Sequence, residues 1–362
     1  MKHWKETGEI VSRVAHLAAD GRRAAVATAV RISGSSYRRP GAKFLVEDDG
    51  GTVGGVSGGC LEADVRVVAR DVMRTGTPRL LHYETGGDDR TIWGLGLGCN
   101  GSVDIFVQSA TDPASSETLA AARVLLEEHD TSFAIATVVD APGGIGRSML
   151  VDPRGVVTGS TGDAEIDRIV RQRIDASLAD GRSRLDEIDD RLVFTDVLSV
   201  PPRLVVCGAG DDSRPLVAYA SDVGFSVTVI DHRPDFLTPA RFPSARQLLQ
   251  LRAGDDISAL RVNGRTLVVA KTHSFANDRE WVRSFLQAGA PYVGLLGPRA
   301  RREEILGQIG VDAPQVFGPI GLDVGADGPE QVAISIVGEL LAFHSTRAGG
   351  HLREKTETIH AV

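Results

Sequence analysis

The chain has 362 residues, of which 42% are hydrophobic and 24% are charged, and its formal net charge is -8. A single hydrophobic core rarely grows to this length, so at least two domains are expected. The negative charge, without basic residues interleaved with aromatic ones, argues against nucleic acid as a partner. No membrane-spanning run of apolar residues and no signal-peptide core occurs, so we expect a cytoplasmic protein without an integral membrane segment.

The first 75 residues alternate between helical and strand patterns. Ile10, Val14 and Leu17 recur at helical spacing, and the apolar run at 24–30 predicts a buried strand. A turn rich in glycine and serine, a second apolar segment at 42–46 and a turn at 48–51 lead to a helical pattern from 61 to about 74. This order is typical of an α+β region.

The same order returns from Phe133 onward, which indicates an internal duplication. Residues 134–139 match residues 25–30 at an offset of 109, and the offset falls to 103 where Glu165 is aligned with Glu62. The second copy lacks the paired glycines and the thiol that the first copy carries at 58–60. If both copies fold alike, that thiol is not needed for folding, which favours a chemical role.

After Pro201 and Pro202 the pattern changes to strand, glycine turn and helix in repetition. Apolar runs at 204–206, 227–230, 267–270 and 292–296, separated by helical stretches, predict a parallel, doubly wound sheet of the Rossmann type. The predicted fold class is therefore α/β, with a duplicated α+β region at 1–200, a Rossmann-type domain at 201–346 and a flexible polar tail at 347–362.

The chain has three cysteines, Cys60, Cys99 and Cys207, too few for a disulfide framework, so reduced thiols are expected. Cys60 follows Gly58 and Gly59 at the start of a predicted helix, where backbone N–H groups and the helix dipole stabilise a thiolate that can act as nucleophile or soft-metal ligand. The alternative is a small buried residue at a tight turn. Cys207, on a predicted strand, is expected in the core.

A second glycine-rich loop, at 94–101, contains Gly98 and Cys99 and would let backbone approach a ligand. A hairpin turn with an incidental thiol explains this loop equally well. The two Gly-Cys loops could face one another and present both thiolates to one ligand. A zinc site is the rival use of the pair, but the cysteines lack CxxC spacing and a nearby pair of histidines.

In the predicted Rossmann domain, Gly208 and Gly210 form a GxG turn after an apolar strand, and Asp231 ends the next strand. This is the context of the dinucleotide-binding fingerprint. However, Ser213 replaces the third glycine, and Asp211-Asp212 bring carboxylates to the place where a pyrophosphate would bind. The pattern therefore predicts the fold while leaving NAD(P) binding open.

Other polar residues follow the later strands of this domain or lie in a basic loop near the N-terminus. His273, Asp231 and Arg299 should lie at the carboxyl edge of the sheet as ligand contacts or proton carriers, or else be solvated loop residues. In the basic loop, a phosphate or an acidic partner could bind, although a solvated turn explains it equally well. This loop carries Tyr37, Arg38, Arg39 and Lys43.

Taken together and in order, the motifs resemble the XdhC/CoxI family, over nearly the whole chain. The resemblance implies an accessory protein for xanthine dehydrogenase and aerobic CO dehydrogenase types, one that binds molybdenum cofactor, assists its sulfuration and delivers it to the apoenzyme. The chain departs from the family pattern at Asp211, where histidine is common, and at Ser274, where an acidic residue is common. The motifs are Gly34-Ser35-Ser36, Pro40-Gly41-Ala42-Lys43, Ser57-Gly58-Gly59-Cys60-Leu61-Glu62, Gly98-Cys99, Cys207-Gly208-Ala209-Gly210, Val229-Ile230-Asp231-His232-Arg233-Pro234, Thr272-His273, Tyr292-Val293-Gly294-Leu295-Leu296-Gly297 and Gly321-Leu322-Asp323-Val324-Gly325-Ala326.

By this resemblance, Cys60 and Cys99 are expected to touch the molybdenum centre or a transferred sulfur, which suits the preference of thiolates for soft metals. The cofactor is expected where the Gly-Cys loops approach the Rossmann crevice, in a protein that forms homodimers. The expected partners are the apo molybdenum hydroxylase and a cysteine desulfurase. Further cofactor contacts are expected from Gly58, Gly59, Glu62, Gly98, Gly208, Gly210, Asp231 and His273.

Two other functions fit the residues. One is an NAD(P)-dependent oxidoreductase with a redox thiol pair, which the GxG turn and Asp231 favour. The other is a scaffold that binds the client enzyme without using its thiols.

Overall fold

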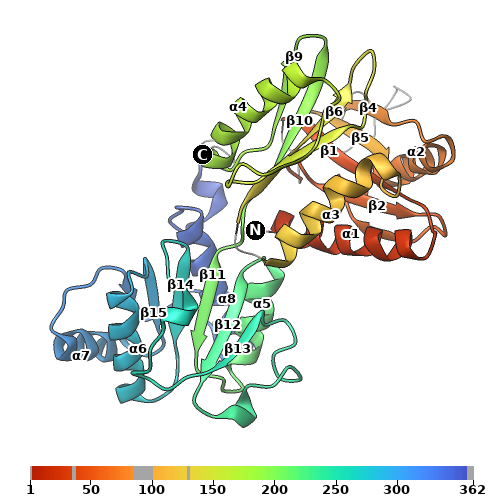
Figure 1. The fold of residues 1–362 in the computed structure, drawn as a ribbon. Coiled ribbons are helices and arrows are strands. Elements are labelled where there is room, and N and C mark those ends of the chain that lie inside the picture. Colours follow the sequence, from red (N-terminus) through yellow and green to blue (C-terminus); the bar gives the residue numbers. More distant parts are fainter. Residues whose placement is uncertain (1, 35–37, 85–100, 129–130, 357–362) are drawn as a thin grey trace. The chain divides into compact units, whose positions relative to one another are not determined.

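The computed structural model describes residues 2–34, 38–84, 101–128 and 131–356. The chain divides into two compact units, Met1–Val200 and Pro201–Val362 (Figure 1). Among the described residues, no helix is long and apolar enough to cross a membrane.

The N-terminal unit contains the same motif twice, which confirms the predicted duplication. Each copy forms a five-stranded antiparallel sheet, with orders β3-β2-β1-β5-β4 and β8-β7-β6-β10-β9. The first copy comprises α1 (Lys2–Ala19), β1 (Ala24–Gly34), β2 (Lys43–Glu47), β3 (Thr52–Gly54), α2 (Glu62–Thr75), β4 (Arg79–Glu84) and β5 (Gly101–Ser109). The second comprises α3 (Pro113–Glu128), β6 (Phe133–Asp140), β7 (Ser148–Val151), β8 (Val157–Gly159), α4 (Ala164–Asp180), β9 (Arg184–Ile188) and β10 (Arg191–Leu198).

The strand register shows which residues of the two copies are equivalent. Ala25 lies opposite Val46 in the first copy, and Ala134 lies opposite Val151 in the second. Val46 and Val151 are therefore equivalent, at an offset of 105 residues (151 minus 46). The left-handed glycines that end α2 and α4, Gly76 and Gly181, have the same offset (181 minus 76). The offset of 103 expected at the helix start is therefore wrong by two residues.

The corrected register pairs Glu62 with Asp167 and Cys60 with Glu165. It also pairs Leu61 with Ile166, and both of these side chains are 1% exposed. Alignment by residue type matches the carboxylates Glu62 and Glu165, whereas the fold matches the positions that enter the core.

Each copy is stabilised by an amphipathic helix that packs on its sheet. In α2, the buried residues Val65, Ala69 and Val72 follow helical spacing and contact the first sheet. In α4, Ile166, Val170 and Ile174 make the equivalent contacts with the second sheet, in a separate hydrophobic cluster. Helices α1 and α3 pack against each other.

The C-terminal unit has a six-stranded parallel sheet of order β13-β12-β11-β14-β15-β16, which confirms the predicted Rossmann-type fold. The order reverses between β11 and β14, and ligands of such folds bind at this switch point. In the stretch predicted as a tail, residues 352–354 form a single turn of 3-10 helix and 357–362 lie outside the described residues. The elements are β11 (Arg203–Cys207), α5 (Ser213–Asp222), β12 (Ser226–Asp231), β13 (Gln247–Gln250), β14 (Thr266–Ala270), α6 (Phe275–Gln287), β15 (Tyr292–Leu295), α7 (Arg299–Ile309), β16 (Val316–Phe317) and α8 (Pro329–His344).

Candidate functional site

Cys60 lies in a short glycine loop between β3 and α2. Its side chain is exposed, and α2 begins two residues later at Glu62. Gly58 has a φ of 101° and Gly59 a φ of 121°, a backbone conformation that L side chains rarely adopt. The paired glycines therefore have a backbone role: they let the chain reach Cys60 without forming a helical turn.

The second copy has an ordinary helix start at the equivalent position. There α4 begins at Ala164, and the Asp163 carboxylate caps it by accepting from the backbone N–H groups of Glu165 and Ile166. The first copy thus replaces the first turn of a helix with a loop that presents a thiol. Since the second copy folds with the helical turn, the loop is not a requirement of the motif.

Glu62 holds this loop in place. Its carboxylate accepts hydrogen bonds from the backbone N–H groups of Val56 at 3.0 Å, Ser57 at 2.9 Å and Gly59 at 2.9 Å, and from the Ser57 hydroxyl. Burial raises the pKa of Glu62, but these hydrogen bonds outweigh it and lower the pKa to about 2. The backbone N–H groups of this loop, where the sequence suggested cofactor contacts, therefore already donate to Glu62. Glu62 is thus a positioning residue for the loop.

Replacing Glu62 by glutamine should loosen the loop, because an amide offers one acceptor oxygen and turns its N–H groups toward other donors. We expect the Glu62→Gln protein to lose about 1–3 kcal/mol of unfolding free energy, with faster hydrogen exchange at residues 56–59. The matched control is Asp167→Asn, since Asp167 accepts from the Thr161 N–H at 2.8 Å in the second copy. Unchanged exchange in the Glu62→Gln protein would contradict the positioning role.

The second predicted thiol, Cys99, and its neighbour Gly98 lie outside the described residues. The strands that flank them, β4 and β5, end at Glu84 and begin at Gly101. In the second copy, only Asp189 and Asp190 separate β9 from β10. Residues 85–100 are thus a second feature that only the first copy has.

The register gives the direction in which the chain leaves the first sheet toward each of the two special segments. Strand β3 ends at Gly54, opposite Phe44, and Phe44 in turn lies opposite Ala27. Because β3 runs in the same direction as β1, the chain leaves β3 toward the end of β1, where Gly34 lies opposite Gly101. The chain therefore leaves β3 in the direction of the end of the sheet where β4 ends at Glu84 and β5 begins at Gly101, and Gly54 lies seven residues before that end.

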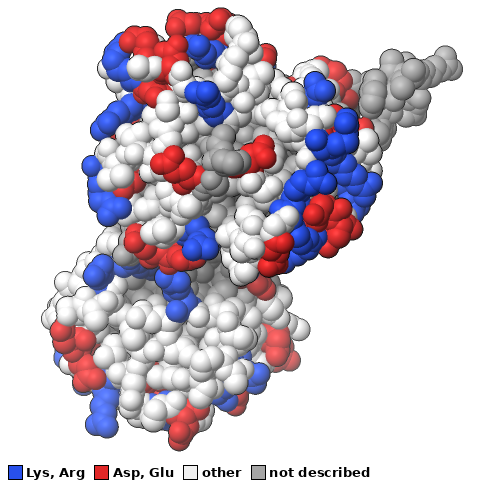
Figure 2. All heavy atoms as spheres, turned by 45° about the vertical axis from the view of Figure 1, so that its right-hand side comes forward, with Lys and Arg blue, Asp and Glu red and all other residues white. Residues whose placement is uncertain are grey.

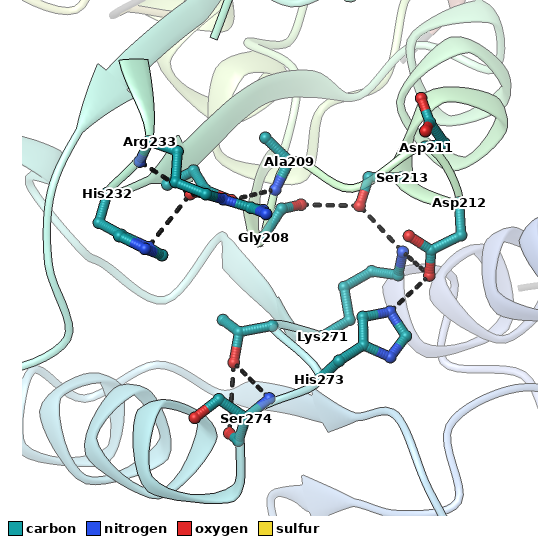
Figure 3. A network of polar contacts seen from close by, with 12 residues as sticks. Gly208, Ala209, Asp211, Asp212, Ser213, His232, Arg233, Lys271, His273 and Ser274 are labelled. Atoms are coloured by element: carbon teal, nitrogen blue, oxygen red, sulfur yellow. Dashed lines mark hydrogen bonds and ion pairs between the residues drawn. The ribbon is translucent and has the colours of Figure 1, made fainter. Parts of the chain in front are cut away.

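The switch point of the Rossmann unit holds a buried ammonium group (Figure 3). The Lys271 side chain is 2% exposed, donates to Ser213 Oγ at 2.9 Å and pairs with Asp212 at 2.7 Å. The backbone of Gly208, with a φ of 117°, lies close to that of Lys271. A β-carbon at position 208 would be 2.7 Å from the Lys271 carbonyl oxygen. Burial lowers the pKa of Lys271, while Asp212 partly opposes that shift.

His273 follows this lysine and shares its carboxylate partner. Its Nε2 lies 2.9 Å from Asp212 Oδ2, its side chain is 63% exposed and its φ is 60°, which is rare for a residue other than glycine. Burial raises the pKa of Asp212, but Lys271 and His273 lower it further, so the carboxylate stays ionised. Asp211 pairs with Arg241 at 3.0 Å. The carboxylates of Asp211 and Asp212, which were expected to oppose a phosphate, therefore both have positively charged partners.

Asp231 is occupied within the domain. Its carboxylate accepts from the Ala209 N–H at 2.7 Å and from the Arg233 guanidinium at 2.9 and 3.0 Å. Burial raises the pKa of Asp231, but these donors lower it to about 2. In this structure Asp231 therefore fixes the glycine turn, and its role as a cofactor contact stays a prediction.

Two other residues singled out in the sequence lie close to this sheet. Cys207 is fully buried on β11, and burial raises the pKa of its thiol well above the ordinary value. Arg299 is exposed at the start of α7. Its neighbour Arg301, which the sequence analysis did not single out, donates to the buried carboxylate of Asp278 at 2.7 Å.

Comparison with known proteins agrees with this arrangement. A model of the XdhC Rossmann domain matches residues 204–340, and a model of the XdhC and CoxI family matches residues 17–84 and 126–189, one segment in each copy of the duplicated motif. The chain belongs to the XdhC and CoxI family. The resemblance that the motifs indicated is thereby confirmed.

Named relatives of this XdhC/CoxI protein include two bacterial proteins and one crystal structure. It is 31% identical to a probable xanthine dehydrogenase subunit of Bacillus subtilis, over 89% of this chain and 93% of that protein. It is 34% identical to the molybdenum cofactor insertion chaperone PaoD of Escherichia coli, over 24% of this chain and 26% of PaoD. A crystal structure described as a xanthine dehydrogenase from Bacillus halodurans aligns with a TM-score of 0.77 and 28% identity, over 94% of this chain and 98% of that one.

Two of the charges in the basic loop of this XdhC/CoxI protein are paired within the N-terminal unit. Arg38 donates to both carboxylate oxygens of Glu6, at 3.1 and 2.5 Å. The Lys43 ammonium pairs with the buried carboxylate of Asp196 in the second copy and donates to the Gly41 carbonyl at 3.0 Å. Tyr37 lies outside the described residues. The charges of Arg38 and Lys43 are therefore used inside the fold, whereas Arg39 is exposed, and binding of a phosphate or an acidic partner at this loop stays a prediction.

Between the two copies lies a cavity of about 70 Å³. Equivalent residues of both copies line it, among them Thr28 and Thr137 on β1 and β6, and Phe106 and Phe194 on β5 and β10. Asp196 also lines this cavity. Sequence reasoning found neither the cavity nor the ion pair, because their residues are far apart along the chain.

Proposed function

We propose that this protein binds the molybdenum cofactor and helps to insert it, in sulfurated form, into a molybdenum hydroxylase of the xanthine dehydrogenase or CO dehydrogenase type. The observation that carries the proposal is the exposed thiol of Cys60, presented by a glycine loop that the second copy of the same motif replaces with a helical turn. The names of the relatives support the same role, since one is a molybdenum cofactor insertion chaperone and another is a probable component of a xanthine dehydrogenase.

Cys60 has two chemical uses in this proposal. A thiolate is a soft ligand and suits a molybdenum centre that also carries sulfur. The Cys60 thiolate can also attack the outer sulfur of a persulfide on a cysteine desulfurase. Cys60 then carries the persulfide, and the cysteine of the desulfurase leaves as a thiolate. Cys99 assists in either case, a role supported by the direction of β3, which leads the chain toward the end of the sheet that flanks residues 85–100.

The remaining predicted contacts take different roles in this proposal. Glu62 fixes the loop that presents Cys60, and Asp231 fixes the turn at Gly208 and Gly210, so neither carboxylate needs to touch the cargo. His273 is an exposed polar group at the switch point and stays the predicted cofactor contact of the Rossmann unit. The protein acts as a carrier and does not turn over xanthine.

The test is binding of isolated molybdenum cofactor to the anaerobic protein, with NAD(H) as competitor. We expect wild type to bind the cofactor, NAD(H) not to compete, and Cys60→Ala to weaken binding about tenfold or more, a loss of about 1.4 kcal/mol or more. Cys99→Ala should weaken it less. A thiol placed at the equivalent position of the second copy, by Glu165→Cys in the Cys60→Ala protein, should not restore binding.

Other outcomes would contradict the proposal. Cofactor binding that is equally tight in Cys60→Ala and Cys99→Ala would favour a scaffold. Binding of NAD(H) with hydride transfer, and no binding of the cofactor, would favour an NAD(P)-dependent oxidoreductase.

A further inference from the structure

The outer face of α2 carries a row of arginines directly after the Cys60 loop. Arg66, Arg70 and Arg74 are exposed and lie four residues apart, which places them on one face of the helix. Val67, beside this row, is 64% exposed. Figure 2 shows Lys and Arg side chains gathered on the part of the N-terminal unit that carries α2. We call the set of these four residues the α2 face.

The second copy shows which part of this face the fold requires. Arg66 donates to the Gly50 carbonyl at 3.0 Å, and its equivalent Arg171 donates to the Gly155 carbonyl at 3.1 Å, so this arginine is structural in both copies. The other three positions differ, because α4 carries Gln172, Asp175 and Ala179 where α2 carries Val67, Arg70 and Arg74. The motif therefore folds without the exposed valine and without the two further positive charges.

The charges on the α2 face are only partly balanced within the protein. Arg74 pairs with Asp71 at 2.7 Å, and both side chains are well exposed. Among the residues that the structure describes, Arg70 forms no ion pair. A local positive patch on a chain of net charge -8 favours a partner that presents negative charge.

The α2 face lies close enough to Cys60 for one protein partner to contact both. A standard interface covers about 800 Å² on each partner, which corresponds to a radius of about 16 Å. Along α2, the stretch from Glu62 to Arg70 spans about 12 Å, and Cys60 lies two residues before Glu62. A partner whose interface is centred on the Cys60 loop therefore also reaches the first half of the α2 face.

We propose that the α2 face is the docking surface for an acidic patch on the molybdenum hydroxylase apoenzyme, with Val67 as an apolar contact between the arginines. This inference rests on the proposed function, since it assigns the surface through which the cargo on Cys60 reaches its client. Arg70 and Arg74 steer the encounter and set its register, so the association weakens as salt rises.

The test exchanges the α2 face for the surface that α4 shows to be compatible with the motif. The variant Val67→Gln/Arg70→Asp/Arg74→Ala should keep the melting temperature and the cofactor affinity of wild type. Its affinity for a purified, cofactor-free xanthine dehydrogenase of the same organism should fall about tenfold or more at low salt and lose most of its salt dependence. The control Arg168→Asp/Arg173→Ala makes the same change of net charge on α4 and should bind like wild type.

The outcomes separate docking from cargo binding. The inference is overturned if the α2 variant binds the apoenzyme as tightly as wild type, if the α4 control loses as much affinity, or if wild type binds cofactor but no apoenzyme. Loss of cofactor affinity in the α2 variant also overturns it, because the arginines would then hold a phosphate of the cargo. Failure of wild type to bind cofactor refutes the proposed function, while apoenzyme binding still tests the docking surface by itself.

Discussion

A protein in which Gly58→Asp and Gly59→Ala give the first copy the helix start of the second is expected to be more stable and to hold its cargo much more weakly. Aspartate at a helix N-cap contributes about 1 kcal/mol, and alanine in place of glycine in a helix about 1 kcal/mol. The helix α2 should then begin one turn earlier, as α4 does at Ala164. Cys60 would remain in the chain but would become part of that turn.

We therefore expect this variant to gain about 1–3 kcal/mol of unfolding free energy and to bind molybdenum cofactor about a hundredfold more weakly than wild type. Denaturation curves and cofactor titration measure the two effects. The matched control is Asp163→Gly/Ala164→Gly, which should destabilise α4 by a similar amount and leave cofactor binding unchanged. Full binding by the first variant would show that the thiol alone, without the glycine conformation, is sufficient.

The sequence predicted the architecture well because burial leaves a periodic record. Continuous apolar runs at 204–206 and 267–270, short and bounded by turn residues, favour strands covered on both faces, and they form β11 and β14 of the parallel sheet. The duplication was visible because β1 and β6 keep nearly the same small, apolar residues. Both inferences depend on local patterns and need no knowledge of contacts between distant residues.

The helix start in each copy was harder to predict, because equivalent positions carry different side chains. The core fixes the register through Leu61 and Ile166, whereas the chemically similar Glu62 and Glu165 are two residues out of step. Asp167, one methylene shorter than Glu62, accepts the Thr161 N–H just as Glu62 accepts that of Val56. Similarity of residue type was therefore a poor guide to similarity of role.

Charge compensation was also hidden from the sequence. Asp212 seemed to oppose an anion, but β14 lies beside β11 in the sheet and brings Lys271 and His273 to its carboxylate. Lys43 seemed to be a free cation, but its partner, Asp196, is 153 residues away. Such pairs follow from strand order, which local periodicity does not record.

Removing the buried carboxylate of Asp196 is expected to destabilise the N-terminal unit strongly. Asp196 is 5% exposed and accepts from the Lys43 ammonium, from His3 Nε2 at 2.9 Å and from the Ser183 hydroxyl at 3.2 Å. Asp196→Ala leaves the ammonium of Lys43 nearly buried without its counter-charge, which should cost about 3–5 kcal/mol of unfolding free energy. Urea denaturation at neutral pH measures the loss.

The second copy of the duplicated motif suggests a control variant for this prediction. Ser148 and Gln108 occupy the positions equivalent to Lys43 and Asp196, so the double variant Lys43→Ser/Asp196→Gln should recover most of the stability.

The same ion pair should make the stability of the protein depend on pH. Burial raises the pKa of Asp196, but Lys43 and His3 lower it further, to below its ordinary value. A carboxylate whose pKa is depressed by folding stabilises the protein fully above its unfolded pKa, near 3.9, and this stabilisation is lost as pH falls toward the folded pKa. Wild type should therefore lose stability below about pH 4 more steeply than the double variant; equal instability of the single and double variants at neutral pH would show that the ion pair is not the cause.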